Sequence, residues 1–182
     1  MSNYRRAFVE NGMIFITIVT YKRNPILIKN IRKLIKSLKQ VKNKYNFELI
    51  GFIILPDHIH ALIHPNNIKE YPQIISSFKA YFSRMIDNAE IETAKKYLTK
   101  SNILKREKGI WQRRYWEHTI KDEDEFNAYL DYIHYNPVKH NLVNSVKNWR
   151  FSSFHKFVMK GFFDKNWGNY DDIKYIKELI CE

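Results

Sequence analysis

The order in which strand-like and helix-like apolar patterns follow one another constrains the fold of this chain most strongly. Apolar or β-branched runs predict strands at residues 13–20, 47–55, 58–64 and 115–120. Helical spacing predicts one helix that begins at Asn24-Pro25, a second at residues 73–86, and a third that begins at Asp122 and ends where Pro137 follows Asn136. The inward stripe of the first helix is predicted to be Ile28, Ile31, Ile35, Leu38, Val41 and Tyr45. This order predicts an α+β fold, a ferredoxin-like or RRM-like antiparallel sheet with helices on one face.

Within its 182 residues, the chain contains no internal repeat and no Pro/Gly-rich linker. We therefore expect one domain over residues 1–148, followed by an aromatic-rich C-terminal tail, residues 149–182, that packs back on it. The longest apolar run, residues 49–55, is much too short to cross a bilayer. The single Cys181 excludes an internal disulfide framework or a Cys-rich zinc cluster. These features predict a cytoplasmic protein with no membrane segment.

The charge of the chain indicates an anionic partner. Lysine and arginine number 31 against 19 acidic residues, which gives a net charge of +12. Residues 29–44 contain seven lysines and arginines and no acid, a pattern typical of a surface that faces nucleic acid. Aromatic and basic residues also alternate in Trp111, Arg113, Arg114, Tyr115 and Trp116, which suits base stacking beside a bound backbone. The alternatives are lysines that only confer solubility and aromatic residues that belong to the core.

The sharpest local motif is His58-Ile59-His60. Alternate side chains of a strand share a face, so the two imidazoles point the same way with Cα atoms roughly 6.6 Å apart. Imidazoles at this spacing can bind one divalent ion. The alternative is a pair of histidines on a solvated strand face.

A second pair of candidate residues lies on the last predicted helix. Tyr132 and Asn136 are four residues apart and share a face, which borders the packing stripe of Phe126, Leu130 and Ile133. An amide oxygen suits Mg²⁺ or Mn²⁺ better than zinc. The alternative is that Tyr132 packs at the edge of the helix and Asn136 caps its end.

Several separated motifs resemble a known family. His58-Ile59-His60, preceded by Leu55-Pro56-Asp57, resembles the His-hydrophobic-His motif of the HUH nuclease superfamily. Three later runs resemble the REP-associated tyrosine transposases, which are single-tyrosine members of that superfamily: WQRRYWEHTI at residues 111–120, YLDYIHYNPVKH at 129–140 and WRFSSF at 149–154. The similarity keeps the order of the motifs from residue 3 to about residue 167.

The resemblance implies a site and a reaction. Tyr132 would be the nucleophile, and His58, His60 and Asn136 would bind Mg²⁺ or Mn²⁺, although larger relatives have glutamine at the last position. Attack by Tyr132 on a DNA phosphate would give a 5′-phosphotyrosine link and a free 3′-hydroxyl. The implied partner is a single-stranded DNA hairpin of a repetitive extragenic palindrome, bound by a nucleoid-associated monomer or homodimer. Whether Tyr132 completes the site of its own chain or of a partner stays open at this point.

Seven basic residues are candidate contacts to the DNA backbone, although each is equally interpreted as a solvated surface charge: Arg5, Arg6, Lys79, Arg84, Arg113, Arg114 and Lys139. Two other functions remain alternatives to the strand transferase. One is a plasmid-type HUH nicking enzyme, and the other is a non-catalytic nucleic-acid-binding sheet domain.

Overall fold

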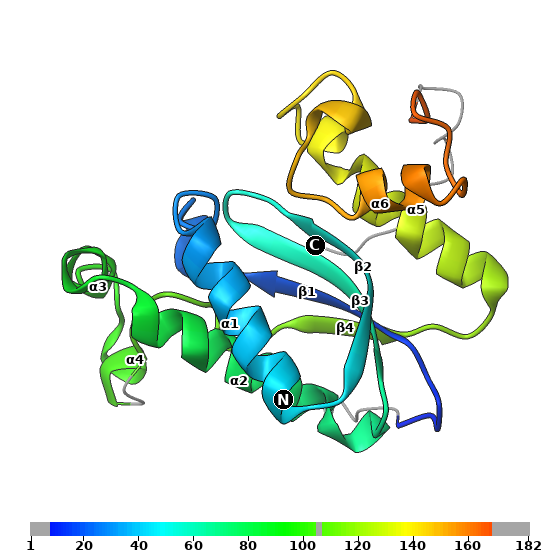
Figure 1. Cartoon of the computed structure of the whole chain (residues 1–182). Coiled ribbons are helices and arrows are strands. Elements are labelled where there is room, and N and C mark those ends of the chain that lie inside the picture. The colour runs from blue at the N-terminus through cyan, green and yellow to red at the C-terminus, as the bar shows by residue number, and fades with distance from the viewer. Residues whose placement is uncertain (1–7, 105–106, 169–182) are drawn as a thin grey trace.

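Four strands form one antiparallel sheet in the computed structural model, which describes residues 8–104 and 107–168 (Figure 1). They are β1 (Ile14–Val19), β2 (Phe47–Ile54), β3 (His58–Pro65) and β4 (Trp116–Thr119). The strand order is β2-β3-β1-β4, so β4 lies at one edge beside β1. All four predicted strands are present, and the predicted α+β fold is confirmed.

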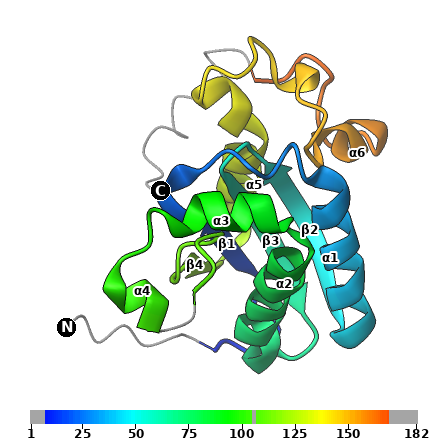
Figure 2. The ribbon, with the colours of Figure 1, turned by 90° about the vertical axis from the view of Figure 1, so that its left-hand side faces the viewer.

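Helices cover both faces of this sheet. The helices are α1 (Ile31–Lys44), α2 (Tyr71–Met85), α3 (Asn88–Lys95), α4 (Lys100–Leu104), α5 (Glu123–Lys139) and α6 (Phe154–Met159). Short 3₁₀ turns lie at Tyr21–Arg23, Ile68–Glu70 and Val146–Asn148. α1 and α2 lie side by side on one face, as predicted, and Figures 1 and 2 show α5 on the opposite side of the sheet. The sequence predicted helices on one face only, so the position of α5 on the second face was not predicted.

The apolar pattern of β1 explains why both faces are covered. Ile14, Ile16 and Ile18 point toward α1 and α2, whereas Phe15 points toward α5. Since successive side chains of a strand alternate between faces, a strand with large apolar side chains on both faces must be covered on both sides. β1 therefore requires the second layer that α5 supplies.

The first helix begins at Ile31 rather than at the predicted Asn24-Pro25 pair. Asn24 is extended, as expected of a residue that precedes proline. Ile26 and Leu27 then turn inward and are buried, and the amide of Leu27 donates to the carbonyl of Pro56 at 2.9 Å. This hydrogen bond ties Leu27 to the turn between β2 and β3. Most of the predicted stripe faces the core, since Val41 is buried and Ile31, Leu38 and Tyr45 pack against it. Ile35 is the exception, at 47% exposed, and Leu34 is buried instead.

The last helix continues through Pro137, where the sequence predicted its end. Asp122 begins α5 as expected, since its carboxylate accepts from the amide of Glu125 at 2.8 Å. Pro137 lacks an N–H and leaves one helical hydrogen bond unmade, but its ring is buried and the helix reaches Lys139. Burial of the ring favours the helical path that local geometry disfavours. The extra turn places Lys139 and His140 over the sheet.

Residues 149–168 lie against β2 and α5. Ser152 forms an isolated bridge with Ile53, and the amide of Ser153 donates to the carbonyl of Phe52 at 2.9 Å. The indole N–H of Trp149 donates to the carbonyl of Ile54 at 3.0 Å. These contacts join the described part of the tail to the outer edge of the sheet. Across the described residues, every helix is too short or too polar to cross a membrane.

Candidate active site

The two histidines of the motif lie beneath α5. In the register of the sheet His60 faces Thr17 and His58 faces Val19. Their ring centroids are 4.9 Å apart, with an angle of 81° between the planes. The exposed fractions of the residues are 2% for His58 and 0% for His60. The pair therefore shares one face, as predicted, but that face is buried and not solvated.

Each imidazole is held through its Nδ1 atom. His60 Nδ1 lies 2.8 Å from the hydroxyl of Thr17, and His58 Nδ1 lies 2.6 Å from the carboxylate of Asp57. Partners on Nδ1 fix the ring orientation and leave Nε2 as the nitrogen that can bind a metal. The sequence predicted Asp57 only as a turn residue, and its spacing gave no sign of this second role.

The Asp57 carboxylate is electrostatically adapted to this position. Burial alone would raise its pKa, but hydrogen bonding to His58 and the charge of that ring oppose the effect. Arg23 adds an ion pair at 3.2 Å, and the net result is a pKa of Asp57 below its ordinary value. The carboxylate therefore stays ionised and remains an acceptor for the His58 ring.

Tyr132 is fully buried against the histidines of its own chain. Its ring centroid lies 5.1 Å from that of His60 and 6.0 Å from that of Phe15. The sequence placed Tyr132 at the border of the packing stripe, whereas the structure places it within the buried cluster. The ammonium group of Lys139 donates to the phenol oxygen at 3.3 Å and lies 4.8 Å from the ring centroid. Lys139 was predicted only as a DNA contact.

Asn136 lies on the helix face between two residues that contact the histidines. Tyr132, one turn earlier, packs on His60, and His140, one turn later, has its ring 5.0 Å from that of His58. The side chain of Asn136 is fully buried, and neither amide atom has a hydrogen-bond partner among the described residues. An unsatisfied buried amide costs free energy, so it indicates a ligand. Sequence spacing did not predict His140 as part of this cluster.

The donor set fits a divalent metal with oxygen and imidazole ligands. In the described part of the chain, histidine, cysteine and carboxylate side chains do not cluster in threes as a metal site. The third protein donor beside His58 and His60 would therefore be the Asn136 amide oxygen. Two imidazoles and one amide oxygen leave open positions and suit Mn²⁺ or Mg²⁺.

The predicted DNA contacts are not gathered at one place. Arg5 and Arg6 lie outside the described residues. Lys79 donates to the carbonyls of Gln112 and Arg113 at 2.7 and 3.1 Å, and burial lowers its pKa to about 8 against the opposing charge of Glu107. The Lys79 ammonium is thus engaged within the protein.

The remaining predicted contacts are more accessible. Arg84 is exposed on α2, on the face away from Tyr132, and its guanidinium lies 4.7 Å from the Tyr81 ring centroid. Arg113 and Arg114 are exposed just before β4, and Lys139 lies at the phenol of Tyr132. Of these residues, Lys139 contacts the candidate nucleophile directly, whereas the backbone of Arg113 contacts Lys79 of α2.

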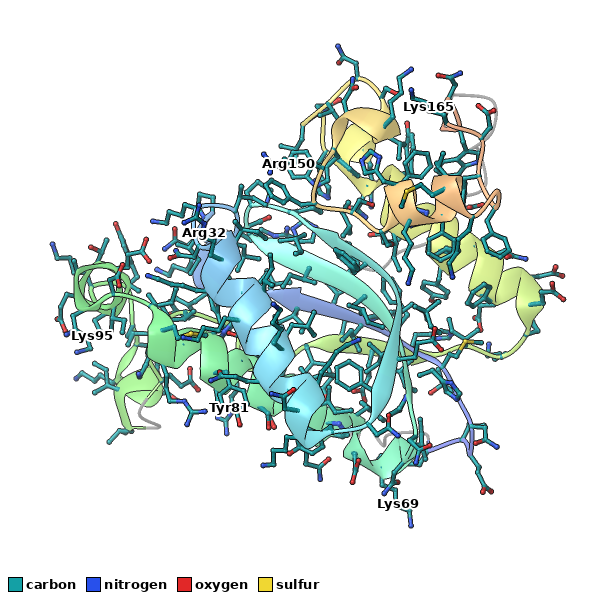
Figure 3. All side chains as sticks on the ribbon, in the orientation of Figure 1. Arg32, Lys69, Tyr81, Lys95, Arg150 and Lys165 are labelled. Carbon is teal, nitrogen blue, oxygen red and sulfur yellow. The ribbon has the colours of Figure 1, made fainter. Side chains whose placement is uncertain are left out.

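The one-signed basic stretch forms α1, which lies on the opposite side of the sheet from Tyr132. Its flank is partly neutralised, since Lys29 pairs with Glu90 and Lys33 pairs with Asp87 at 2.8 Å. Figure 3 shows labelled basic side chains on several sides of the molecule, including Lys69 and Lys165. Basic side chains thus lie on several sides of the described fold, and the most basic stretch, α1, is not on the face of Tyr132.

A cavity of about 470 Å³ also lies on the side of α1 and α2. Its lining is almost entirely apolar, with Arg32 and Arg150 as the charged members. It shares no residue with the cluster of His58, His60, Tyr132 and Asn136.

Comparison with known proteins defines the class. A family model for IS200-like transposases matches residues 8–136. A Haemophilus influenzae protein, provisionally named a REP-associated tyrosine transposase, is 40% identical over 176 residues, which are 96% of this chain and 97% of that protein. A REP-associated tyrosine transposase of Escherichia coli is 32% identical over 182 residues and 99% of each chain.

A solved structure gives the same result at the level of the fold. It is that of a REP-associated tyrosine transposase bound to a REP hairpin, with a TM-score of 0.74 and 28% identity over 92% of this chain and 91% of that one. This chain belongs to the IS200-like transposases and, within them, to the REP-associated tyrosine transposases. The resemblance found in the motifs is thereby confirmed, and the chain is a tyrosine transposase enzyme.

Proposed function

We propose that this enzyme cleaves and rejoins single-stranded DNA beside hairpins of palindromic repeats, with Tyr132 as the nucleophile. The observation that carries the proposal is the buried cluster of Tyr132, the two histidines and the unsatisfied Asn136 amide. The hairpin as partner is supported by the relative whose solved structure contains a REP hairpin.

His58, His60 and Asn136 would hold Mg²⁺ or Mn²⁺. When bound, such an ion makes a phosphate more electrophilic and offsets its developing negative charge. The role of the chain is to fix the donors. Asp57 and Thr17 orient the imidazoles through Nδ1, and Asn136 follows Tyr132 by one turn on the buried face of α5.

The covalent step is a balanced exchange of phosphodiester bonds. The phenol oxygen of Tyr132 bonds to phosphorus, and the bond from phosphorus to the 3′ oxygen breaks. The phenol proton is matched by the proton that the released 3′-hydroxyl gains, so no nucleotide is hydrolysed. Phenols ionise at a pKa near 10, and the Lys139 ammonium beside the oxygen stabilises the phenolate as it forms. The reverse step on another strand rejoins DNA.

Access to Tyr132 requires movement, because the residue is fully buried. α5 contacts β2 and β3 and carries both Tyr132 and Asn136, so a shift of α5 would open the site. Tyr132 packs on His60 of the same chain, which supports cleavage by a single protomer.

The direct test is incubation with a labelled single-stranded hairpin oligonucleotide and Mn²⁺, followed by denaturing electrophoresis. We expect a protein–DNA adduct that is absent in Tyr132→Phe and in EDTA, while Tyr132→Phe still binds the oligonucleotide. Binding without any adduct in the unmodified protein would instead identify a nucleic-acid-binding domain. A metal-dependent cut without covalent attachment would contradict the role of Tyr132.

A further inference from the structure

The aromatic residues that alternate with arginines before and in β4 have three different environments. Trp111 is 7% exposed, packs on Phe82 with ring centroids 5.2 Å apart, and donates its indole N–H to the carbonyl of Lys79 at 3.2 Å. Tyr115 packs on the same apolar core. Trp116 is 36% exposed and lies on the other face of the sheet. Only Trp116, of these three, offers a ring surface to a ligand.

Trp116 belongs to a row of side chains that crosses the sheet to the active site. In register, Trp116 pairs with Thr17, and Thr17 pairs with His60. Paired residues in neighbouring strands have side chains on the same face, so the three side chains line up. Two strand spacings separate Trp116 from His60, which is roughly 10 Å between their Cα atoms. The indole therefore lies on the same face of the sheet as the candidate metal ligands, two strands away from His60.

The indole is held by neighbours that also contact the nucleophile. Its ring lies 5.6 Å from that of Phe15 in an edge-on arrangement, and Phe15 contacts the rings of His60 and Tyr132. On its own strand it stacks with His118 at 5.9 Å and an angle of 16°. His118 is itself held by Glu125 at 2.6 Å. The indole thus has a defined orientation at the edge strand of the sheet, beside β1 (Figure 1).

We propose that Trp116 is the stacking platform for the base that flanks the scissile phosphate. This inference rests on the proposed function and adds to it a contact that positions the substrate. A tryptophan face accepts any base, and its attraction is independent of the backbone charge. A base stacked on Trp116 directs its phosphate along the row toward Thr17, His60 and Tyr132. The exposed Arg113 and Arg114 precede this position in the chain and suit the backbone that leads to it.

The test is a double-mutant cycle that combines a substitution of Trp116 with the removal of one base from the DNA. Binding is measured in a Tyr132→Phe background so that no chemistry intervenes. The probes are hairpin oligonucleotides with single-stranded flanks, either intact or with one abasic site at successive flank positions. We expect Trp116→Leu to weaken binding of the intact probe roughly tenfold and Trp116→Phe to stay within about twofold. At one flank position, the abasic site should weaken binding roughly tenfold when Trp116 is present and not at all in Trp116→Leu.

Two controls separate stacking from folding. Phe162→Leu, which removes an aromatic residue that is 70% exposed in the C-terminal segment, should leave binding unchanged. Thermal unfolding of each variant reports whether it is folded. If Trp116→Leu is not folded, the abasic probes are compared between the unmodified Trp116 and Trp116→Phe, which retains a smaller ring. Equal losses for every abasic probe with and without the indole would overturn the proposal. Failure of the covalent chemistry shows separately, as a missing adduct in the protein that retains Tyr132.

Discussion

The two faces of the sheet are built from different chemistry. Toward α1 and α2, β1 and β3 bury isoleucine and alanine side chains. Toward α5, the same strands bury Thr17, His58 and His60 beside Phe15. Apolar burial contributes about 25 cal/mol per Å², whereas polar burial without partners lowers stability. One face therefore stabilises the fold, and the other holds polar groups in a fixed arrangement through partners such as Asp57.

Two neighbouring residues of β3 test this division most strongly. His60→Gln should reduce Tyr132-dependent adduct formation at least about a thousandfold, because a bound metal supplies several kcal/mol of transition-state stabilisation. Ile59→Val, on the other face, should cost about 0.5–1.5 kcal/mol of unfolding free energy and leave the adduct rate unchanged. Electrophoresis of the adduct and urea unfolding measure the two effects. Similar losses of activity in both variants would contradict the different roles of the two faces.

A larger deletion on the apolar face should affect stability alone. Phe82 of α2 is fully buried in the core on this face, and Phe82→Ala is expected to lower the unfolding free energy by about 3–5 kcal/mol. Urea titration measures the loss. At a temperature where the variant is still folded, its adduct rate should match that of the unmodified protein, and a selective loss of rate would contradict the separation of the faces.

The outer side of α5 predicts a pH dependence. Burial, reinforced by the charge of His155, lowers the pKa of His134 to about 3, while its Nε2 atom lies 2.9 Å from the hydroxyl of Ser153. The unfolded chain takes up this proton near pH 6.5 and the folded chain does not, so stability is lost as the pH falls from 6.5 toward 3. We expect a loss of about 2 kcal/mol between pH 7 and pH 5 from this group. In His134→Gln, the unfolding free energy measured in urea should therefore depend less on pH than in the unmodified protein.

The smallest expected effect is a gain in stability at the active face. Asn136→Leu replaces an amide without partners by an apolar group of similar size, and should raise the unfolding free energy by on the order of 1 kcal/mol in EDTA. Addition of Mn²⁺ should raise the melting temperature of the unmodified protein but not that of the variant. Thermal unfolding with and without the ion measures both. Equal responses to Mn²⁺ would remove Asn136 from the proposed ligand set.

The sequence predicted local features well where a pattern repeats. The four strands, the beginning of α5 at Asp122 and the shared face of His58 and His60 all follow from alternation or capping. It failed where distant contacts override local preference. Asn24-Pro25 is a good helix start, but the contact of Leu27 with Pro56 delays the helix to Ile31.

Parts of the candidate site lacked any local signal. The partnership of Asp57 with His58 links adjacent residues across a turn, and the approach of His140 to His58 depends on a helix that passes through Pro137. Neither contact has a characteristic spacing in the sequence. The His140 contact exists because α5 lies over β3, whereas the Asp57 contact depends on how the turn between β2 and β3 directs the carboxylate.

By itself the sequence determined which side chains share a face, because that depends on the two- and 3.6-residue periods of strands and helices. It also determined which functional groups are available: two imidazoles on one predicted strand, and one phenol and one carboxamide on one predicted helix. Only the tertiary structure decided which face is covered and by which helix, and hence that Tyr132 and Asn136 are buried while Trp116 stays accessible. The physical reason is that burial depends on packing between residues far apart in the chain, which no local period records.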